Sequence, residues 1–296
     1  MNILVFGANG MVGHELARTL PALGRVQALD RAAADLEDVA EIRRIIARER
    51  PDVVVNAAAY TAVDRAESDA DRARRINAEA PAAMAEEVAR LDGWLVHYST
   101  DYVFDGTKAD PYVETDIPNP LGVYGATKLE GERLIAATGC RHLVFRTSWV
   151  YADRGHNFLR TILRLAGERD ELSIVADQIG SPTSAAFLAG ITAAALGRAA
   201  GPLADRPPSG IYHACPTGST SWHAYARLIV AEALARGATL RTDVERVHAI
   251  PTSAYPTPAR RPANSRLDPA RLTATFGLVP PPWQRDVVVA LESLLA

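Results

Sequence analysis

An apolar run followed at once by three evenly spaced glycines opens the chain. Residues 3–6 read Ile-Leu-Val-Phe, a helical pattern covers residues 14–20, and the turn between them holds Gly7, Gly10, Met11, Val12 and Gly13. The run predicts a strand, and glycines before a helix let backbone N–H groups approach a pyrophosphate at the positive end of the helix. This arrangement predicts a dinucleotide-binding unit. A purely structural glycine turn is the alternative.

The second apolar run, residues 26–29, ends at Asp30. A carboxylate at this distance from the glycine loop accepts hydrogen bonds from the adenosine ribose, which favours NADH. Its neighbour Arg31 can instead bind a 2′-phosphate, which favours NADPH. Asp30 favours NADH and Arg31 favours NADPH, so the sequence does not decide between the two cofactors. A solvated loop acid is the alternative for Asp30.

Apolar runs and helical patterns alternate through the first half of the chain. Further strands are expected at residues 53–55, 94–98 and 143–145, and helices at 39–49 and 70–91, with a kink or restart at Pro81. Such alternation predicts an α/β fold, a Rossmann-type doubly wound parallel sheet. We therefore assign residues 1–150 to a dinucleotide-binding domain.

The pattern loosens after about residue 151. Helices are expected at 157–168, 184–199, 221–236 and 284–295, and an irregular loop rich in Pro, Thr and Arg at 251–266. We interpret residues 151–296 as a smaller substrate-binding lobe, interwoven with the first domain without a clean linker.

Charge and composition exclude several functional classes. The net charge of −3 shows no bias toward nucleic acid or acidic membranes, and no apolar run is long enough to span a bilayer. Only two cysteines occur, Cys140 and Cys215, and no leader-like segment opens the chain, so a cytoplasmic location is expected. Three histidines, His213, His223 and His248, lack the spacing of metal ligands and are interpreted as structural. Trp222 is interpreted as a core residue.

Two further patterns carry catalytic potential. Ser99 and Thr100 close the strand at 94–98, where ligands bind in open α/β sheets. Tyr124 and Lys128 are spaced four apart and share one face if a helix begins there. A nearby ammonium lowers the pKa of a tyrosine and prepares it for acid–base chemistry. Each pattern is weak alone, but together with the glycine loop they predict a catalytic set rather than a surface helix pair.

With these residues in place, the chain resembles the extended short-chain dehydrogenases/reductases, and among them the dTDP-4-dehydrorhamnose reductases. The segments that carry the resemblance are MNILVFGANGMVG, PDVVVNAAAYTAVDRAES, VHYSTDYVFDGT, NPLGVYGATKLEGE, FRTSWVY, DQIGSPT and PTSAYPTPARRPANSRL. The first and fourth suit many members of the superfamily. STDYVFDG, FRTSWVY and AYPTPARRPANSRL are much more particular to these reductases.

The resemblance implies a reaction and a set of roles. These enzymes reduce the 4-keto group of dTDP-4-dehydro-L-rhamnose with NADPH or NADH. Tyr124 would donate the proton, Lys128 would act as its electrostatic partner, and Thr100 would donate a hydrogen bond to the keto oxygen. Other positions would contact the sugar (Asp101, Trp149), the adenine (Asp35, Leu36) and the cofactor crevice (Ala59, Tyr60, Thr61, Tyr98). An anionic dTDP-sugar also needs cations, for which the candidates are Arg260, Arg261 and Arg266.

Several alternatives stay open. Some relatives bind Mg²⁺ through glutamates near a dimer interface, and Glu15 fits such a position. Ala186 stands where those relatives carry another glutamate, and Glu292 is not clearly in register, so no metal ligand is assigned, and a homodimer is left open. The rival functions are another nucleotide-sugar 4-ketoreductase or epimerase, and a regulatory subunit that binds a dinucleotide without turnover.

Overall fold

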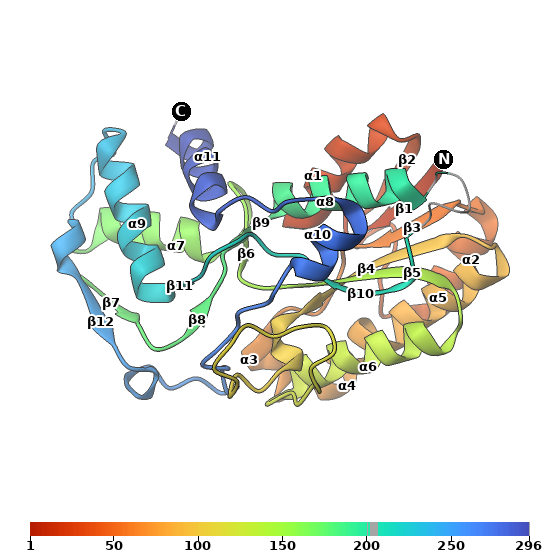
Figure 1. The fold of residues 1–296 in the computed structure, drawn as a ribbon, viewed down its shortest axis with the longest axis horizontal. Helices are drawn as coiled ribbons and strands as arrows, with labels where there is room; N and C mark the ends of the chain where they lie inside the picture. The colour runs from red at the N-terminus through yellow and green to blue at the C-terminus, as the bar shows by residue number, and fades with distance from the viewer. Residues whose placement is uncertain (200, 202–206, 296) are drawn as a thin grey trace.

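A parallel sheet forms the centre of the larger part of the protein. The computed structural model describes residues 1–199, 201 and 207–295. Six strands lie in the order β10-β5-β4-β3-β1-β2 (Figure 1). Their bounds are β1 Asn2–Phe6, β2 Arg25–Leu29, β3 Val53–Asn56, β4 Trp94–Thr100, β5 Arg141–Thr147 and β10 Gly210–His213. Every pairing in this sheet is parallel, as the alternation of apolar runs and helices predicted.

The order of the strands fixes where a ligand can bind. The chain passes from β1 to β2 on one side and then returns to β3 on the other side of β1. Such a reversal leaves a crevice beyond the carboxyl ends of the strands. The glycine loop lies at this point, because it follows β1 directly.

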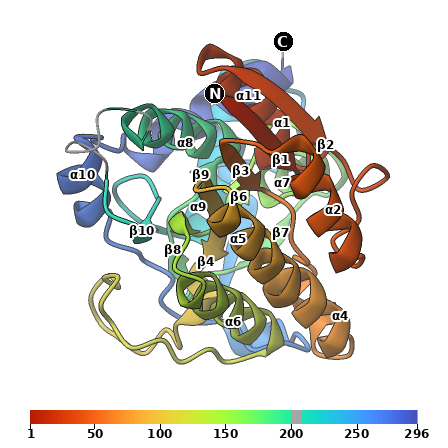
Figure 2. The same cartoon turned by 90° about the vertical axis from the view of Figure 1, so that its right-hand side faces the viewer.

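Helices cover both faces of the sheet (Figure 2). One face packs against α1 Met11–Thr19, α8 Ala185–Ala199 and α10 Ala270–Phe276, and the other against α2 Val39–Glu49, α5 Ala80–Arg90 and α6 Val123–Ala137. Alternate strand residues enter the two cores: Val5, Val55 and Val96 face α1 and α8, whereas Leu4, Val54 and Leu95 face α2 and α5. Strands buried on both faces explain the near-continuous apolar runs of the sequence.

The helix expected at 70–91 is built from three segments. They are α4 Ala70–Arg74, a π-helical turn at Arg75–Glu79 and α5, with Pro81 in the first turn of α5. The expected restart at Pro81 is therefore confirmed, since proline fits a first helical turn. The π-turn places Asn77 so that its side chain binds both backbone groups of Tyr60 (2.9 and 3.1 Å) and the hydroxyl of Thr127 (3.2 Å).

A smaller lobe lies beside the sheet (Figure 1). It contains α7 Phe158–Glu168, α9 Trp222–Ala235, α11 Trp283–Leu295 and the short strand pairs β6 Val150–Tyr151 with β9 Thr183–Ser184, β7 Leu172–Val175 with β12 Val247–Ile250, and β8 Ile179–Gly180 with β11 Thr220–Ser221. Short helical turns complete the described elements: α3 Val63–Ala66, Leu20–Ala22, Asp101–Val103, Val244–Arg246 and Thr252–Ala254. An aromatic and aliphatic core that includes Tyr225, Ile229 and Trp283 holds the lobe together.

The two parts share the chain after residue 150. The strand β10 and the helices α8 and α10 come from the C-terminal half, yet they pack on the central sheet. The interwoven arrangement agrees with the sequence interpretation, and the boundary near residue 150 stays a prediction. The expected loop at 251–266 contains only a short helical turn. None of the described helices is both long enough and apolar enough to cross a membrane.

Candidate active site

A cavity of about 650 Å³ lies beyond the carboxyl ends of β1, β3 and β4. It brings together most of the residues singled out from the sequence: Gly7, Gly10, Met11, Val12, Arg31, Asp35, Leu36, Ala59, Thr61, Tyr98, Thr100, Asp101, Tyr124, Lys128 and Trp149. Six predicted residues do not line it: Gly13, Asp30, Tyr60, Arg260, Arg261 and Arg266. Segments as far apart in sequence as the glycine loop and residues 147–156 meet at this cavity.

The glycine loop has a geometry that only glycine permits. Gly7 has a φ of +89°, and its N–H and that of Ala8 both donate to Leu29 O (2.8 and 3.0 Å). A Cβ on Gly13 would lie 2.0 Å from Gly7 O, so this glycine serves close packing of helix and turn instead of lining the cavity. No side chain caps α1, and Met11 and Val12 of its first turn line the cavity beside Gly10. Such a cradle fits a pyrophosphate.

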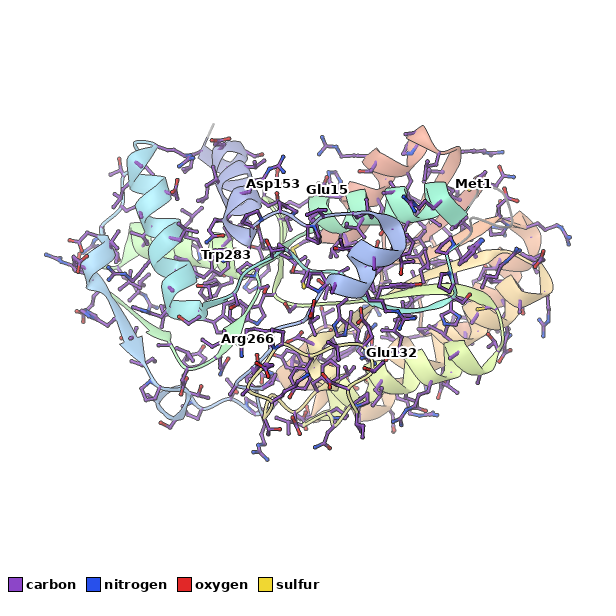
Figure 3. The ribbon with its side chains drawn as sticks, in the orientation of Figure 1. Met1, Glu15, Glu132, Asp153, Arg266 and Trp283 are labelled. Carbon is purple, nitrogen blue, oxygen red and sulfur yellow. The ribbon has the colours of Figure 1, made fainter. Side chains whose placement is uncertain are left out.

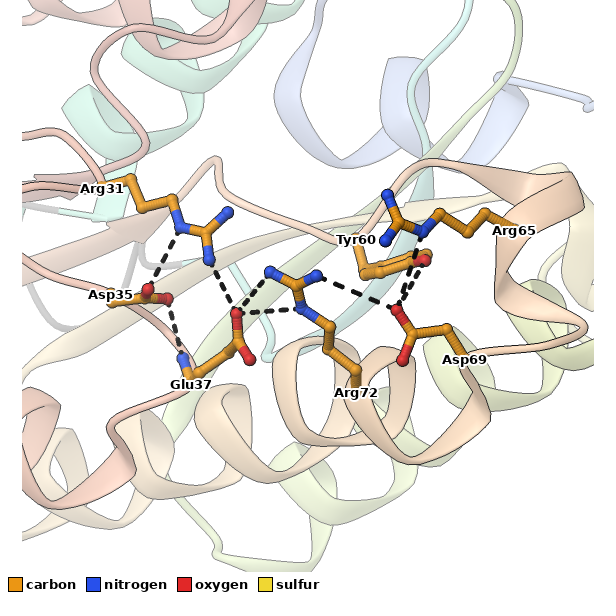
Figure 4. Close-up of polar contacts among 7 residues, drawn as sticks. All are labelled: Arg31, Asp35, Glu37, Tyr60, Arg65, Asp69 and Arg72. Atoms are coloured by element: carbon orange, nitrogen blue, oxygen red, sulfur yellow. Dashed lines mark hydrogen bonds and ion pairs between the residues drawn. The ribbon is translucent and has the colours of Figure 1, made fainter.

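A network of charged residues begins at the cavity wall with Arg31 and Asp35 and continues to Arg72 and Asp69 (Figure 4). Arg31 donates to Asp35 (3.1 Å) and Glu37 (2.7 Å), and Arg72 donates to the same Glu37 oxygen (2.9 and 2.7 Å). Arg72 in turn lies 3.9 Å from Asp69. Arg31 and Asp35 both line the cavity, so a cation and an anion are available at the end where the resemblance places the adenosine.

Asp30 has a local role in the structure. Its carboxylate accepts from Asn9 Nδ2 and from the backbone N–H of Ala33, each at 3.0 Å. These contacts hold the turn after β2, and Asp30 is outside the cavity lining. The carboxylate thus holds the turn, and the predicted contact of Asp30 with a ribose stays a prediction.

Tyr60 lies behind the crevice wall. Its neighbours Ala59 and Thr61 line the cavity, but the Tyr60 ring is buried and its hydroxyl donates to Asp69 Oδ2 (3.1 Å). Asn77 holds the Tyr60 backbone from the π-turn. The sequence predicted that Tyr60 lines the crevice. Its side chain instead points away from the crevice toward α4 and supports the crevice wall from behind.

The three predicted catalytic residues face the cavity from two elements. Thr100 ends β4, accepts from Tyr102 N (3.1 Å) and donates to Asp101 Oδ1 (3.0 Å). Tyr124 and Lys128 lie in the first turns of α6, one helical turn apart. A Cβ on Gly125 would lie 2.1 Å from Tyr102 O, so this glycine lets α6 approach the turn after β4.

Burial dominates the titration of the pair on α6. It raises the pKa of Tyr124 to about 12, with Thr100 opposing the shift, and it lowers the pKa of Lys128 to about 7, with Glu132 opposing the shift. The sequence had led us to expect a lowered tyrosine pKa. The direction is opposite, because removal from water disfavours the phenolate and the ammonium alike.

The sugar-side residues are held rigidly. Trp149 has a φ of +48° and stacks on Trp222 with ring centres 3.5 Å apart. A Cβ on Gly180 would lie 2.5 Å from the Trp149 ring, so glycine is required there. Trp222 is therefore more than the core residue that the sequence suggested. Burial raises the pKa of Asp101 to about 6, so its carboxyl group is ionised only above about that pH.

The sequence reasoning missed part of the cavity wall. Thr147 and Ser148, at the end of β5, line the cavity, as do Gly155 and His156 opposite Met11. The rule that ligands bind at strand ends could have found the first two. Nothing local marks the other two. Asn157, which donates to Ala152 O (2.8 Å), shapes their loop.

Comparisons with known proteins agree with this geometry. The model of the RmlD substrate binding domain family matches residues 1–296. The chain belongs to this family. It is 52% identical over 301 residues to the dTDP-4-dehydrorhamnose reductase of Burkholderia thailandensis, covering 100% of both chains, and 47% identical to that of Escherichia coli K12, covering 99% and 98%.

Solved structures of RmlD-type reductases share the whole fold. A dTDP-4-dehydrorhamnose reductase from Clostridium acetobutylicum superimposes with a TM-score of 0.91 at 33% identity, covering 100% of both chains. One from Bacillus anthracis, solved in complex with NADP, has a TM-score of 0.88 at 32% identity, covering 99% and 98%. A UDP-glucose 4-epimerase of Thermus thermophilus, at 20% identity and a TM-score of 0.79, shares the fold alone.

In this member of the RmlD family, the predicted phosphate-binding arginines have other contacts. Arg261 pairs with Asp64 (2.7 Å) and lies over the Tyr102 ring, and Arg266 donates to Asn264 (2.9 Å). Arg260 is exposed and outside the cavity lining. The first two brace the loop at 251–266, and the role of the three arginines in binding the substrate phosphates stays a prediction.

The acidic residues considered for magnesium are not gathered. Glu15 borders a second cavity of about 570 Å³ together with Asp153 and Ala186 (Figure 3). Glu292 pairs with Arg236 at 3.2 Å. Across residues 1–199, 201 and 207–295, no three His, Cys, Asp or Glu side chains are placed to hold a metal ion.

Proposed function

We propose that this chain reduces the 4-keto group of dTDP-4-dehydro-L-rhamnose to give dTDP-L-rhamnose, using NADPH or NADH. The observation that carries the proposal is one cavity that joins the glycine cradle to Thr100, Tyr124 and Lys128. Full-length identity to reductases of this name supports the choice of substrate. In this proposal residues 1–150 hold the dinucleotide, and residues 151–296 hold most of the sugar nucleotide. The proposed location of the enzyme is the cytoplasm.

The residues of the chain would manage the proton of the reaction. When bound, the dinucleotide supplies a hydride to C4 of the sugar. Tyr124 then donates its proton to O4, on which negative charge develops. Thr100, whose hydroxyl donates to Asp101 in the structure, turns toward the same oxygen. Donors aimed at a developing charge in a buried site give a large share of catalysis.

The remaining contacts would set the position of the substrate. The Trp149 ring, fixed by Trp222 and Gly180, offers a flat apolar face to the sugar. Asp101 accepts hydroxyl hydrogens beside the reacting carbon. Lys128 donates to the nicotinamide ribose from the turn below Tyr124.

The decisive experiment mixes the purified chain with dTDP-4-dehydro-L-rhamnose and follows the absorbance of NADPH and NADH in parallel, with the product identified by NMR. Stoichiometric cofactor loss and a rhamnose product support the proposal. An epimerase would show no net cofactor consumption, and a regulatory subunit would bind dinucleotide without turnover.

A variant pair tests the role of Tyr124. Tyr124→Phe should lower kcat by about 10²–10⁴-fold with little change in cofactor Kd, because only the transferred proton is removed. Tyr255→Phe, at a side chain that is 62% exposed and outside the cavity, is the control and should leave kcat unchanged. Equal turnover in both variants would remove Tyr124 from the mechanism.

A further inference from the structure

Three buried side chains form a line of hydrogen bonds behind the cavity. Asn56 ends β3 and lies opposite His97 of β4 in the parallel ladder. Asn56 Nδ2 is 3.1 Å from His97 Nδ1, and His97 Nε2 is 3.0 Å from Lys128 Nζ. The exposed fractions of Asn56, His97 and Lys128 are 1%, 0% and 1%. Water therefore does not compete for these groups.

The backbone fixes which atom of Asn56 faces the imidazole. Ala58 N–H donates to Asn56 Oδ1 (3.1 Å), so the amide oxygen is turned to the backbone and the amide nitrogen to His97. An amide nitrogen can only donate, which makes His97 Nδ1 an acceptor. A neutral imidazole carries its single proton on the other nitrogen, Nε2.

The direction of the second hydrogen bond follows from the first. Burial lowers the pKa of His97 well below its usual range, so the ring is neutral. Nε2–H then donates to Lys128 Nζ, and a nitrogen accepts such a bond only if it has a free lone pair. An ammonium group has none. Every hydrogen bond from Ala58 through Asn56 and His97 to Lys128 can therefore form at once only when Lys128 is a neutral amine.

We propose that His97, oriented by Asn56, is a positioning residue that presents Nε2–H to Lys128 and holds this lysine as a neutral amine in the cofactor-free protein. The consequence for catalysis rests on the proposed reductase function. Protonating Lys128 would require His97 either to lose this bond or to move its proton to Nδ1, against the Asn56 amide. A neutral Lys128 leaves Tyr124 as the phenol, which is the form a proton donor needs.

The charged and titratable neighbours do not supply another partner for Lys128. On α6, Glu132 binds Arg146 of β5 through both carboxylate oxygens. On β4, Asp101 accepts from Thr100, and the Tyr98 hydroxyl pairs with Thr192 of α8. Tyr124 lines the cavity together with Thr100. Within the described part of the chain, His97 is the only hydrogen-bond partner of the Lys128 side chain.

The chain is suited to a direct test because its only lysines are Lys108 and Lys128. In protein labelled with carbon-13 at lysine Cε, two signals are expected, and Lys108→Arg assigns them. Lys108 pairs with Asp116 on a distant loop (2.6 Å) and serves as the internal control. The Lys128 signal should titrate near neutral pH, since burial lowers the pKa of Lys128 to about 7.

The Asn56→Asp substitution should reverse the direction of the hydrogen bonds between residue 56, His97 and Lys128. A carboxylate accepts from Ala58 N–H and from His97 Nδ1–H, so Nε2 becomes an acceptor that favours an ammonium. The pKa of Lys128 should rise by about one pH unit or more, and the pH profile of kcat should shift in the same direction. Lys108 should not move. No rise at Lys128 in a variant that still binds dinucleotide would overturn the proposal.

The added charge needs its own control. The same Asn56→Asp change in a His97→Leu background places the carboxylate at the same site without the imidazole. The rise at Lys128 should shrink severalfold in that background, since leucine transmits no hydrogen bond. An equal rise in both backgrounds would show a through-space charge effect and would overturn the proposal.

The wild-type protein gives an independent answer if the variants fold poorly. Nitrogen-15 NMR of labelled histidine reads which ring nitrogen of His97 carries the proton. Protonation at Nε2 is expected, and protonation at Nδ1 would overturn the proposal. None of these NMR measurements uses substrate, so their outcome is separate from success or failure of the reductase assay.

Discussion

Glu132 binds Arg146 through two hydrogen bonds of 2.9 and 2.6 Å, and only 2% of each side chain is exposed. The pair joins α6 to β5 one helical turn beyond Lys128. Arg146 also lies over the Phe104 ring, 5.1 Å from its centre. The helix that carries Tyr124 and Lys128 is thereby fixed to the sheet that carries Thr100.

Breaking this pair should destabilise the fold strongly. Glu132→Gln leaves the Arg146 charge buried without compensation, so the free energy of unfolding should fall by about 3–5 kcal/mol. Urea unfolding measures it. The control is Glu130→Gln, because Glu130 pairs with Arg74 where 35% and 49% of the side chains are exposed, and its loss should change the unfolding free energy by about 0–1 kcal/mol. Similar values for both variants would contradict the prediction.

The packing of the glycine loop predicts a sensitive position. A Cβ at Gly13 would meet backbone at 2.0 Å, whereas a Cβ at Gly167, within α7, has nothing within 4 Å. Gly13→Ala should therefore weaken dinucleotide binding by tenfold or more, about 1.4 kcal/mol, since the cradle must shift. Gly167→Ala should leave binding unchanged and raise stability by about 0.4–1 kcal/mol. Calorimetric titration and urea unfolding give both values.

Arg31 should distinguish the two cofactors. Its guanidinium borders the cavity beside Asp35, and only NADPH offers it a 2′-phosphate. Arg31→Ala should weaken NADPH binding by about tenfold more than NADH binding, a difference of about 1.4 kcal/mol. Arg18→Ala is the control, because Arg18 is as exposed (68% against 66%) but lies outside this cavity. Equal losses for both cofactors would exclude a phosphate contact at Arg31.

The local features of the site could be predicted from the sequence. The glycine loop, the strand ends and the spacing of Tyr124 and Lys128 follow from short-range patterns, and the structure brings these residues to one cavity. Side-chain direction could not be predicted where a distant partner decides it. Tyr60 turns to Asp69, and Arg261 turns to Asp64, because those carboxylates approach from α4 and α3.

The elements that escaped prediction are short. The strand β10 has four residues, and most strands of the smaller lobe have two. Such segments are too short for a period to appear, and long-range pairing alone defines them. The line from Asn56 to Lys128 escaped for the same reason, since it crosses three elements that are far apart in sequence.

The titration of Asp101 predicts how stability depends on pH. Burial raises the pKa of Asp101 from its ordinary value of 3.8 to about 6. Below about pH 4 the carboxyl is protonated in both the folded and the unfolded state, so it has no effect. Above about pH 6 it is ionised in both states, and ionisation is less favourable in the folded one. The wild type should therefore lose stability relative to Asp101→Asn as pH rises from about 4 to 7, by up to about 3 kcal/mol.

Urea unfolding of both proteins across this range measures the difference, and Asp105→Asn supplies a control of opposite sign. Hydrogen bonds from the Thr107 backbone and from Asn119 lower the pKa of Asp105 well below its usual range. Its ionised form therefore stabilises the fold above the unfolded-state pKa, and this stabilisation is lost as pH falls. With the measurements extended down to about pH 2, Asp105→Asn should thus become less stable relative to wild type as pH rises to about 4. Asp101→Asn should instead become more stable relative to wild type between about pH 4 and 7. A gap between Asp101→Asn and wild type that stays constant with pH would mean that Asp101 ionises as freely in the folded protein as in the unfolded chain.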